Sequence, residues 1–427
     1  MGRLAAMRHR TYPKSALVST PGRSDQHPIA LVGPNPGSAR HEHKNKHQMR
    51  ILHVNERAGF YGGVEQILHD IASGLRALGH PQALLHTDPH PREDFLETFD
   101  ESASGLLQTD ELIHAFRPDA LLIHRLADAD AVERLAARAP AARMVHGHGL
   151  ICPRGNKLFP ISHRSCDRPV GIDCWTHLCV LQRRPPWLRL RAVAEHRRAL
   201  RTHQGVRRFI VGSHWMRQAL VGNGIEPERV RVLPPVPSSL ATTSPQPPSD
   251  RPEILFVGPV IATKGVDLLL RALTKVSGPW HTTVIGTGDD IDACKALAKA
   301  LDIAHCVTFT GWVHHEDLDD YYARAAVSVV PSRWPEPFGM VGIEAMARGR
   351  PVVGFAVGGI PDWLEHGVTG LLAPEADTDA LGAHIQTLLQ DKALAHRLGQ
   401  QAAERVHERF QPDAFRSSLL QILAEAS

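Results

Sequence analysis

The feature that most constrains the fold is an alternation of strand and helix patterns that runs through the chain twice. Short apolar segments such as residues 50–55 precede segments with apolar residues at helical spacing, such as residues 64–80. The alternation stops at a Pro/Ser-rich stretch, residues 236–252, and then restarts. Alternating strands and helices indicate parallel sheets with helical crossovers. We therefore predict an α/β fold of two Rossmann-like, doubly wound parallel-sheet domains that face a central cleft.

The length of 427 residues fits this division, because one ordinary core does not grow so large. We expect five segments: a disordered basic extension over 1–48, an N-terminal domain over 49–235, a linker over 236–252, a C-terminal domain over 253–405 and a C-terminal helix over 406–427.

The first 48 residues differ from the rest in charge and pattern. They hold eight Lys or Arg and two Asp or Glu, a net charge of +6, so the remaining chain carries +3 − 6 = −3. They are rich in Pro, Gly, Ser and His and lack periodicity, which is typical of disorder. Strand-like sequence begins abruptly at Met49, so we consider Met49 as a translation start. A nucleic-acid-binding arm is the less favoured interpretation, and we expect no nucleic-acid partner.

Composition indicates a soluble protein, with 43% hydrophobic and 22% charged residues. No apolar run approaches the roughly 20 residues that cross a bilayer. We therefore expect a cytoplasmic location. Residues 183–208 raise a second interpretation, because they contain nine Arg and one acid with apolar residues such as Trp187 and Leu190 between them. A solvated basic helix is the simpler interpretation, and a membrane-surface patch at the inner face is the alternative.

The most informative local sequence is RWPEPFGMVGIEAMARGRPVV, which begins at Arg333 and follows a predicted strand. Pro335 and Pro337 restrict the backbone on both sides of Glu336 and hold its carboxylate at a loop tip. Gly339 lets the backbone approach a ligand closely. This loop lies at the carboxyl end of its strand, where open α/β sheets bind ligands.

A helix is predicted directly after this loop, and its first amides have no partner within the helix. The amides of Gly339, Met340 and Val341 therefore predict a phosphate site. Glu344 lies about one turn further along. A phosphate between two acids fits a sugar nucleotide, with Glu336 on the sugar and Glu344 on the ribose. Taken alone, Glu336 is more simply explained as a loop charge, and Glu344 as a carboxylate stabilised by the helix dipole. The Pro-Glu-Pro-Phe-Gly context disfavours that explanation for the two acids together.

These residues resemble the E-x7-E motif of the family 4 retaining glycosyltransferases of the GT-B fold. The likeness includes Glu336-Pro-Phe-Gly, Glu344-Ala-Met-Ala and Gly358-Gly359, and it extends over most of residues 49–427. The resemblance implies that residues 49–235 form the acceptor side and residues 253–405 the nucleotide-sugar donor domain.

The resemblance also implies roles for individual residues. Glu336 contacts the transferred sugar, His146 approaches that sugar from the N-terminal domain, and Lys264 binds the diphosphate, so these three form the implied catalytic set. The implied donor-binding residues are glycines, helix amides and two side chains: Gly62, Gly63, Gly258, Lys264, Gly339, Met340, Val341 and Glu344.

Two positions depart from the family pattern. The family usually has Gly-Arg-Leu before the lysine, and this chain has Gly258-Pro259-Val260. Proline cannot donate a hydrogen bond, so leaving-group stabilisation rests more on Lys264 and on amides. Either another arginine substitutes, or the activity is altered. The family also often has His-Asp where this chain has His146-Gly147-His148.

The resemblance implies a hexosyltransferase-type, retaining reaction from a UDP- or GDP-sugar to a carbohydrate or lipid-linked glycan, in surface polysaccharide biosynthesis. It implies no catalytic metal. The missing arginine keeps one alternative open, a non-catalytic relative that binds sugar nucleotides. A nicotinamide-binding interpretation is disfavoured, because the glycine loop at residues 58–65 is not G-x-G-x-x-G.

Four cysteines cluster in the N-terminal half with the spacing C-x13-C-x7-C-x4-C: Cys152, Cys166, Cys174 and Cys179. The spacing contains no C-x2-C pair, which zinc sites usually have. Some family members carry a similar Cys-Pro-Arg-Gly insertion followed by further cysteines. A structural metal is one interpretation, and thiols that pack a loop or form a disulfide are the favoured one.

Overall fold

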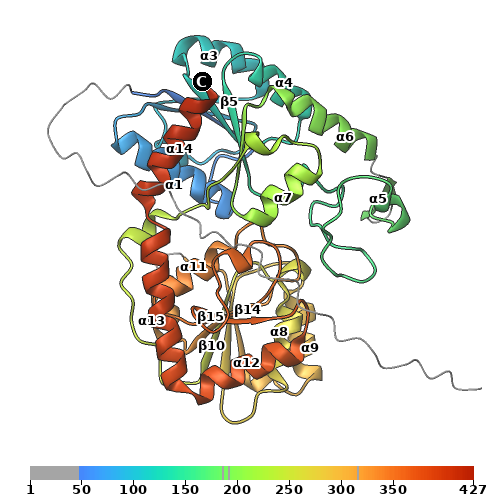
Figure 1. Ribbon diagram of the computed structural model, residues 1–427, viewed down its shortest axis with the longest axis vertical. Helices are drawn as coiled ribbons and strands as arrows, with labels where there is room; N and C mark the ends of the chain where they lie inside the picture. The colour runs from blue at the N-terminus through green and yellow to red at the C-terminus, as the bar shows by residue number, and fades with distance from the viewer. Residues whose placement is uncertain (1–47, 185–186, 191–192, 315–316) are drawn as a thin grey trace, which may run out of the picture.

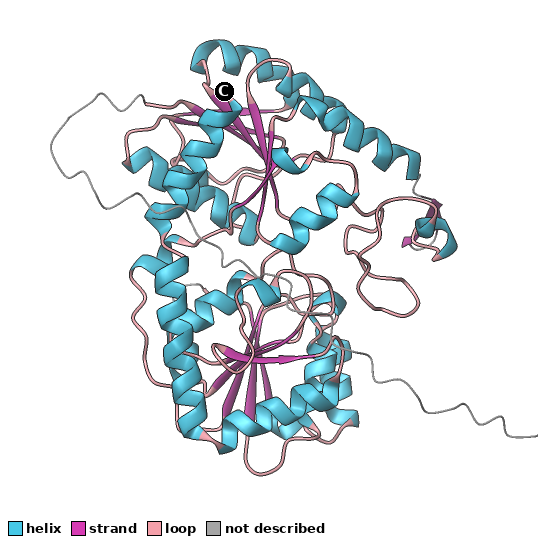
Figure 2. Ribbon diagram, viewed as in Figure 1, coloured by secondary structure: helices cyan, strands magenta, loops and turns pink. Residues whose placement is uncertain are grey.

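The computed structural model describes residues 48–184, 187–190, 193–314 and 317–427. Two α/β halves lie one above the other, each with a twisted central sheet and helices around it (Figure 1, Figure 2). Both sheets are parallel throughout, which confirms the predicted fold class. The predicted extension over residues 1–48 lies, except for Gln48, outside the described residues.

The N-terminal sheet has seven strands in the order β3-β2-β1-β4-β5-β8-β9. Its strands are β1 (Ile51–Asn55), β2 (Gln82–His86), β3 (Glu101–Ser104), β4 (Ala120–Arg125), β5 (Ala141–Val145), β8 (Arg208–Val211) and β9 (Val230–Val232). Its helices are α1 (Gly63–Ala77), α2 (Glu93–Leu96), α3 (Thr109–Phe116), α4 (Ala129–Ala136) and α7 (His214–Gly222). The central strands are buried on both faces, as parallel strands covered by helices must be.

An insertion separates β5 from β8. It holds α5 (Asp173–Thr176), an antiparallel hairpin of β6 (Leu181–Arg184) and β7 (Trp187–Leu190), and α6 (Val193–Thr202). A single basic helix over residues 183–208 is therefore wrong, because the hairpin of β6 and β7 occupies the first part of this stretch and α6 begins at Val193. Residues 185–186 and 191–192 of that stretch lie outside the described residues. None of the helices in the described ranges has the length and apolarity for a bilayer crossing.

The C-terminal sheet has six strands in the order β12-β11-β10-β13-β14-β15. Its strands are β10 (Glu253–Val257), β11 (His281–Ile285), β12 (Val307–Gly311), β13 (Val327–Val330), β14 (Val352–Phe355) and β15 (Gly370–Ala373). Its helices are α8 (Val266–Leu273), α9 (Ile291–Ala300), α10 (Leu318–Arg324), α11 (Met340–Ala347), α12 (Thr378–Gln390) and α13 (Lys392–Arg409).

The last helix, α14 (Pro412–Ala426), returns from the C-terminal half to the N-terminal sheet (Figure 1). It packs on β4, β5 and β8 and buries Phe415, Leu419 and Leu423. At its end the Glu425 carboxylate lies 3.0 Å from the guanidinium of Arg231. The two halves are thus joined by a helix as well as by the linker, which favours a fixed orientation of the cleft.

We predict that Leu419→Ala lowers the free energy of unfolding by about 2–5 kcal/mol, because it leaves a cavity between α14 and the sheet. The neighbouring exposed residue provides the matched control, Gln421→Ala, with an expected change within about 0.5 kcal/mol. Urea unfolding of both variants measures the difference. Equal effects of the two substitutions would show that α14 is not docked on the sheet.

Candidate functional site

The loop between β13 and α11 lies where the two halves meet. His148, which follows β5 in the N-terminal half, donates from Nε2 to the carbonyl oxygen of Pro335 at 2.6 Å. The His148 ring also packs edge-on against Trp334, with centroids 5.2 Å apart. The predicted site loop is therefore held by the opposite half as well as by its own strand.

Glu336 is almost fully buried, with 3% of its surface exposed. Its Oε1 lies 2.8 Å from Nζ of Lys264 and also accepts from the hydroxyl of Ser332. Burial raises the pKa of Glu336, but the charge and hydrogen bond of Lys264 and the Ser332 hydroxyl outweigh burial and hold it below its ordinary value. The carboxylate is therefore ionised at neutral pH.

Two glycines with left-handed backbone bring this pair together. Gly265, next to Lys264, has φ of 70°, and a Cβ there would lie 2.0 Å from the carbonyl oxygen of Pro331. Gly358 has φ of 56°, and a Cβ there would lie 2.4 Å from the amide of Glu336. Only glycine fits this approach without strain. The lysine turn and the Gly358 turn thus pack directly against the Glu336 loop.

Two helix N-termini are in contact beside this loop. α11 begins at Met340 with Gly339 at its cap, as predicted, and α1 begins at Gly63 with Gly62 at its cap. A Cβ on Gly63 would lie 3.0 Å from Cε of Met340, so the two helix starts are in contact across the halves. The first amides of each helix have no partner within the helix, and such a helix start suits an anion. Glu344 lies one turn beyond Met340 on α11 and is 8% exposed.

A cavity of about 890 Å³ opens beside this loop. His146 and His148 line it from the N-terminal half, and Trp334 lines it from the C-terminal half. Burial, together with the charges of Arg125 and Arg143, lowers the pKa of His146 to about 3. His146 is therefore a neutral ring in the cavity wall at physiological pH.

Pro259 lowers the positive charge that a bound anion would meet, because it stands where the family usually has arginine. Gly258 closes the turn after β10 by donating to the carbonyl oxygen of Ile285 at 2.9 Å, and Pro259 is exposed beside it. Arg333, in the Glu336 loop, lies nearby, because its amide donates to the carbonyl oxygen of Thr263. Its guanidinium, however, pairs with Asp267 at 2.6 Å.

The structure thus brings Lys264 to Glu336 and Gly63 to Met340. Sequence reasoning missed Ser332, Trp334 and the contact between His148 and Pro335. Ser332 and Trp334 lie next to the recognised motif, but neither residue type signals chemistry alone. His148 was singled out only as a departure from the family pattern, and its partner is 187 residues away.

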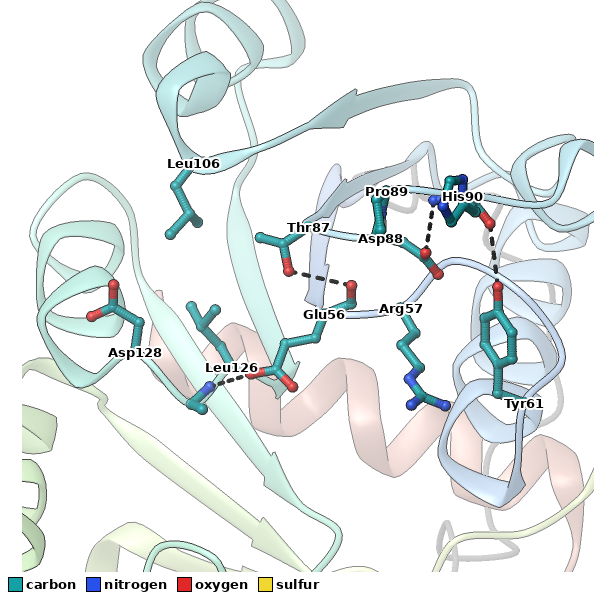
Figure 3. A pocket seen from close by; sticks show the side chains of 11 residues that line it. Glu56, Arg57, Tyr61, Thr87, Asp88, Pro89, His90, Leu106, Leu126 and Asp128 are labelled. Atoms are coloured by element: carbon teal, nitrogen blue, oxygen red, sulfur yellow. Dashed lines mark hydrogen bonds between the residues drawn. The ribbon is translucent and has the colours of Figure 1, made fainter. Parts of the chain in front are cut away.

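A second cavity of about 680 Å³ lies at the carboxyl ends of β1, β2 and β4. Figure 3 shows Glu56, Asp88 and Asp128 around it, with Arg57 and Tyr61 on the side of α1. Glu56 Oε1 accepts from the amide of Ala127 at 2.6 Å, which fixes the carboxylate. Glu56 and Ala127 also line the larger cavity, so the two spaces adjoin.

The four clustered cysteines are free thiols: Cys152, Cys166, Cys174 and Cys179. Burial raises the pKa of Cys166, and it raises that of Cys179 to about 11, so both are protonated at neutral pH. In the described part of the chain, no group of three or more His, Cys, Asp or Glu is placed to hold a metal. A structural metal at these cysteines is therefore not supported.

Comparison with known proteins follows the same division into halves. Residues 61–236 match the model described as Glycosyltransferase Family 4, and residues 242–405 match that described as Glycosyl transferases group 1. A D-inositol 3-phosphate glycosyltransferase of Kineococcus radiotolerans is 34% identical over 43% of this chain and 48% of its own. An uncharacterized glycosyltransferase of Methanocaldococcus jannaschii is 34% identical over 38% of this chain and 42% of its own. The matches thus span less than half of either relative.

Solved structures share the fold over most of the chain. Anabaena HepE in complex with UDP and glucose gives a TM-score of 0.68 at 19% identity, covering 88% of this chain and all of HepE. Sucrose-phosphate synthase from Thermosynechococcus elongatus gives 0.68 at 22% identity, covering 88% of this chain and 98% of its own. With both halves matched and both sheets in place, the chain belongs to the family 4, group 1 glycosyltransferases of the GT-B fold.

Proposed function

We propose that this protein transfers a sugar from a UDP- or GDP-sugar to a glycan or lipid-linked glycan acceptor, with retention of anomeric configuration. The observation that carries the proposal is the ion pair of Lys264 and Glu336 beside the start of α11, which the start of α1 contacts. This arrangement offers positive potential for a diphosphate and an ionised carboxylate for sugar hydroxyls at one place.

The diphosphate leaving group needs positive charge as its bond to the sugar breaks. Lys264 supplies a full charge, and the amides of Met340 and Val341 supply helix-terminus donors. A bound diphosphate would share Lys264 with Glu336, so the lysine would contact both the leaving group and the acid. Glu344, on the same helix, is proposed to bind the ribose.

Glu336 is proposed to bind sugar hydroxyls rather than to attack the sugar. Its Oε1 already accepts from Lys264 and Ser332, which lowers its nucleophilicity and keeps it in place. A carboxylate held in this way stabilises the positive charge of an oxocarbenium-like state. Attack by the acceptor on the face that the diphosphate leaves gives retention.

The acceptor is proposed to enter through the cavity in Figure 3. Its carboxylates, Glu56, Asp88 and Asp128, are hydrogen-bond acceptors, which suit hydroxyl groups. This cavity adjoins the larger one that His146 lines, so an acceptor there has a path toward the donor sugar.

The exposed apolar side chains of the insertion favour a lipid-linked acceptor. Ile161 is 77% exposed, Ile172 74%, and Trp175 47%. They lie in the chain beside the Arg-rich residues 183–208, and apolar side chains with Arg are the chemistry of a peripheral membrane contact. We therefore propose that this insertion touches a membrane surface in polysaccharide biosynthesis.

The exposed Pro259 favours a second function, a non-catalytic protein that binds sugar nucleotides. Arg333 does not replace the missing charge, because its guanidinium is paired with Asp267. The two functions differ in turnover, since a non-catalytic protein would bind the donor without cleaving it.

Glu336→Gln is expected to lower the transfer rate by about 10²–10³-fold, because it removes the charge that faces the sugar. A matched control is Glu425→Gln, which removes a carboxylate paired with Arg231 far from the site and is expected to leave the rate unchanged. Nucleotide release and product formation measure both variants. Full activity of Glu336→Gln would contradict the assigned role.

Nucleotide binding is expected to depend on Lys264. A nucleoside diphosphate at 100 times its dissociation constant adds about 2.7 kcal/mol to stability. We expect a thermal shift with either UDP or GDP, and a smaller shift at equal concentration in Lys264→Met. Lys275→Met is the control. It removes an exposed lysine that pairs with Asp379 on α12 and has no place in the candidate site, so we expect the same shift as in the parent. No shift with UDP, GDP, ADP or TDP would contradict a nucleotide site.

Flotation with anionic liposomes at low salt tests the membrane contact. We expect the protein to float with the vesicles and the double variant Ile172→Ser, Trp175→Ser to float less, since it removes exposed apolar contacts. Trp312→Ser, at an exposed tryptophan of the C-terminal half, is the control and is expected to float like the parent. Absence of the parent protein from the floated fraction would rule the contact out.

A further inference from the structure

A row of three histidines crosses the N-terminal sheet from its core to the candidate site. His53 lies on β1, His124 on β4 and His146 directly after β5, which are neighbouring strands. The register between β1 and β4 shifts after Val54, so His124 lies at the irregularity. The ring planes of His53 and His124 are 22° apart with centroids 5.3 Å apart, and those of His124 and His146 are 14° apart at the same centroid distance.

Hydrogen bonds join the three rings end to end. His53 Nδ1 and His124 Nε2 are 3.1 Å apart, and His124 Nδ1 and His146 Nε2 are also 3.1 Å apart. His53 and His124 are 0% and 2% exposed, so water does not reach them. Each of these bonds needs one protonated and one unprotonated nitrogen, because neutral imidazole carries a single N–H.

The row begins at Gln82, the first residue of β2, which is fully buried. Its Nε2 donates to the carbonyl oxygen of His80 at 2.8 Å, and a carbonyl oxygen can only accept. That bond fixes the orientation of the amide and places Oε1 2.7 Å from His53 Nε2. His53 Nε2 must therefore carry the proton.

The bond from His53 Nε2–H to Gln82 determines which nitrogen carries the proton in each of the three rings. Burial lowers the pKa of His53 to about 4 and that of His124 well below the ordinary range, so both rings are neutral. His53 Nδ1 is then a lone pair and accepts from His124 Nε2–H. His124 Nδ1 likewise accepts from His146 Nε2–H, and the Nδ1 of His146 is left without a proton.

We infer that Gln82 is a positioning residue that acts through His53 and His124 to fix the Nε2–H tautomer of His146. His146 then presents Nδ1 as a hydrogen-bond acceptor in the cavity. His146 Nδ1 accepts a hydrogen bond from a hydroxyl of the donor sugar or of the acceptor, a step that rests on the proposed function. The opposite tautomer would present an N–H there, which cannot accept from a hydroxyl.

The three histidines fix the direction of the hydrogen bonds between them, and they do not conduct protons away from the site. A proton that entered at His146 would have to leave at Gln82, and a carboxamide oxygen does not take up a proton at neutral pH. Inverting all three tautomers, however, preserves both bonds between the rings and loses only the bond to Gln82. That single bond therefore selects between two otherwise similar arrangements.

Two substitutions of Gln82 separate polarity from packing. Gln82→Met keeps the length of the side chain and removes the acceptor, so it permits the inverted arrangement. Gln82→Glu keeps an oxygen that accepts from His53, and its protonated form also donates to the carbonyl of His80. Thr283→Val is the control for loss of a buried hydrogen bond. Thr283 on β11 donates to Glu253 on β10, and both residues lie in the C-terminal half, away from the histidine row.

Neutron diffraction from perdeuterated crystals locates the deuterons directly. We expect a deuteron on Nε2 and none on Nδ1 of His146 in the parent and in Gln82→Glu, and a deuteron on Nδ1 in Gln82→Met. We also expect kcat to fall about tenfold in Gln82→Met, with the donor KM little changed, and to be restored in Gln82→Glu.

A deuteron on Nδ1 of His146 in the parent would overturn the inference, and this result needs no variant to fold. An unchanged tautomer in Gln82→Met would overturn the role of Gln82. If Gln82→Met inverts the tautomer of His146 but keeps the kcat of the parent, the role of His146 Nδ1 in sugar transfer would be overturned. If the parent transfers no sugar at all, the proposed function fails, while the deuteron positions still decide the tautomer.

Discussion

The ion pair between Lys264 and the buried Glu336 is the interaction on which the rest of the site depends. A carboxylate with 3% of its surface exposed would be protonated or displaced without a partner. Lys264 and Ser332 keep it charged, and the turns at Gly265 and Gly358 keep those partners in place. The site is therefore charged before any ligand binds, which reduces the cost of ordering it on binding.

The contacts between the two halves extend this constraint across the cleft. His148 bonds the backbone of the Glu336 loop, and Gly63 at the start of α1 touches Met340 at the start of α11. On the far side, α14 packs on the N-terminal sheet. We expect an anion bound at these helix starts to contact both halves, which would couple ligand binding to the orientation of the domains. His146 adds a neutral ring of defined polarity to the same cavity.

Sequence patterns predicted the two parallel sheets, because buried strands and amphipathic helices leave strong periodic signals. They also predicted the start of α11 at Met340, since Pro337 and Gly339 mark the end of the loop. They did not predict the hairpin of β6 and β7, whose residues read as part of a basic helix. Charge composition does not show whether two segments pair as strands, and the pairing of β6 with β7 determines the structure of this stretch.

The candidate site was predictable only where residues form a local motif. Glu336 and Lys264 were both singled out, but their contact joins two loops 72 residues apart and no local pattern reveals it. The histidine row was harder to predict still. His146 was singled out, but His53 and His124 look like ordinary core residues. The pairing of β1 with β4 and of β4 with β5 places the three side by side.

A crystal structure of the complex with a nucleoside diphosphate would test the central claim most directly. We predict that the terminal phosphate lies within hydrogen-bond distance of Lys264 Nζ and of the amides of Met340 and Val341, with Glu336 still beside the lysine. A diphosphate bound elsewhere, with the pair of Lys264 and Glu336 closed and the start of α11 unoccupied, would contradict the account.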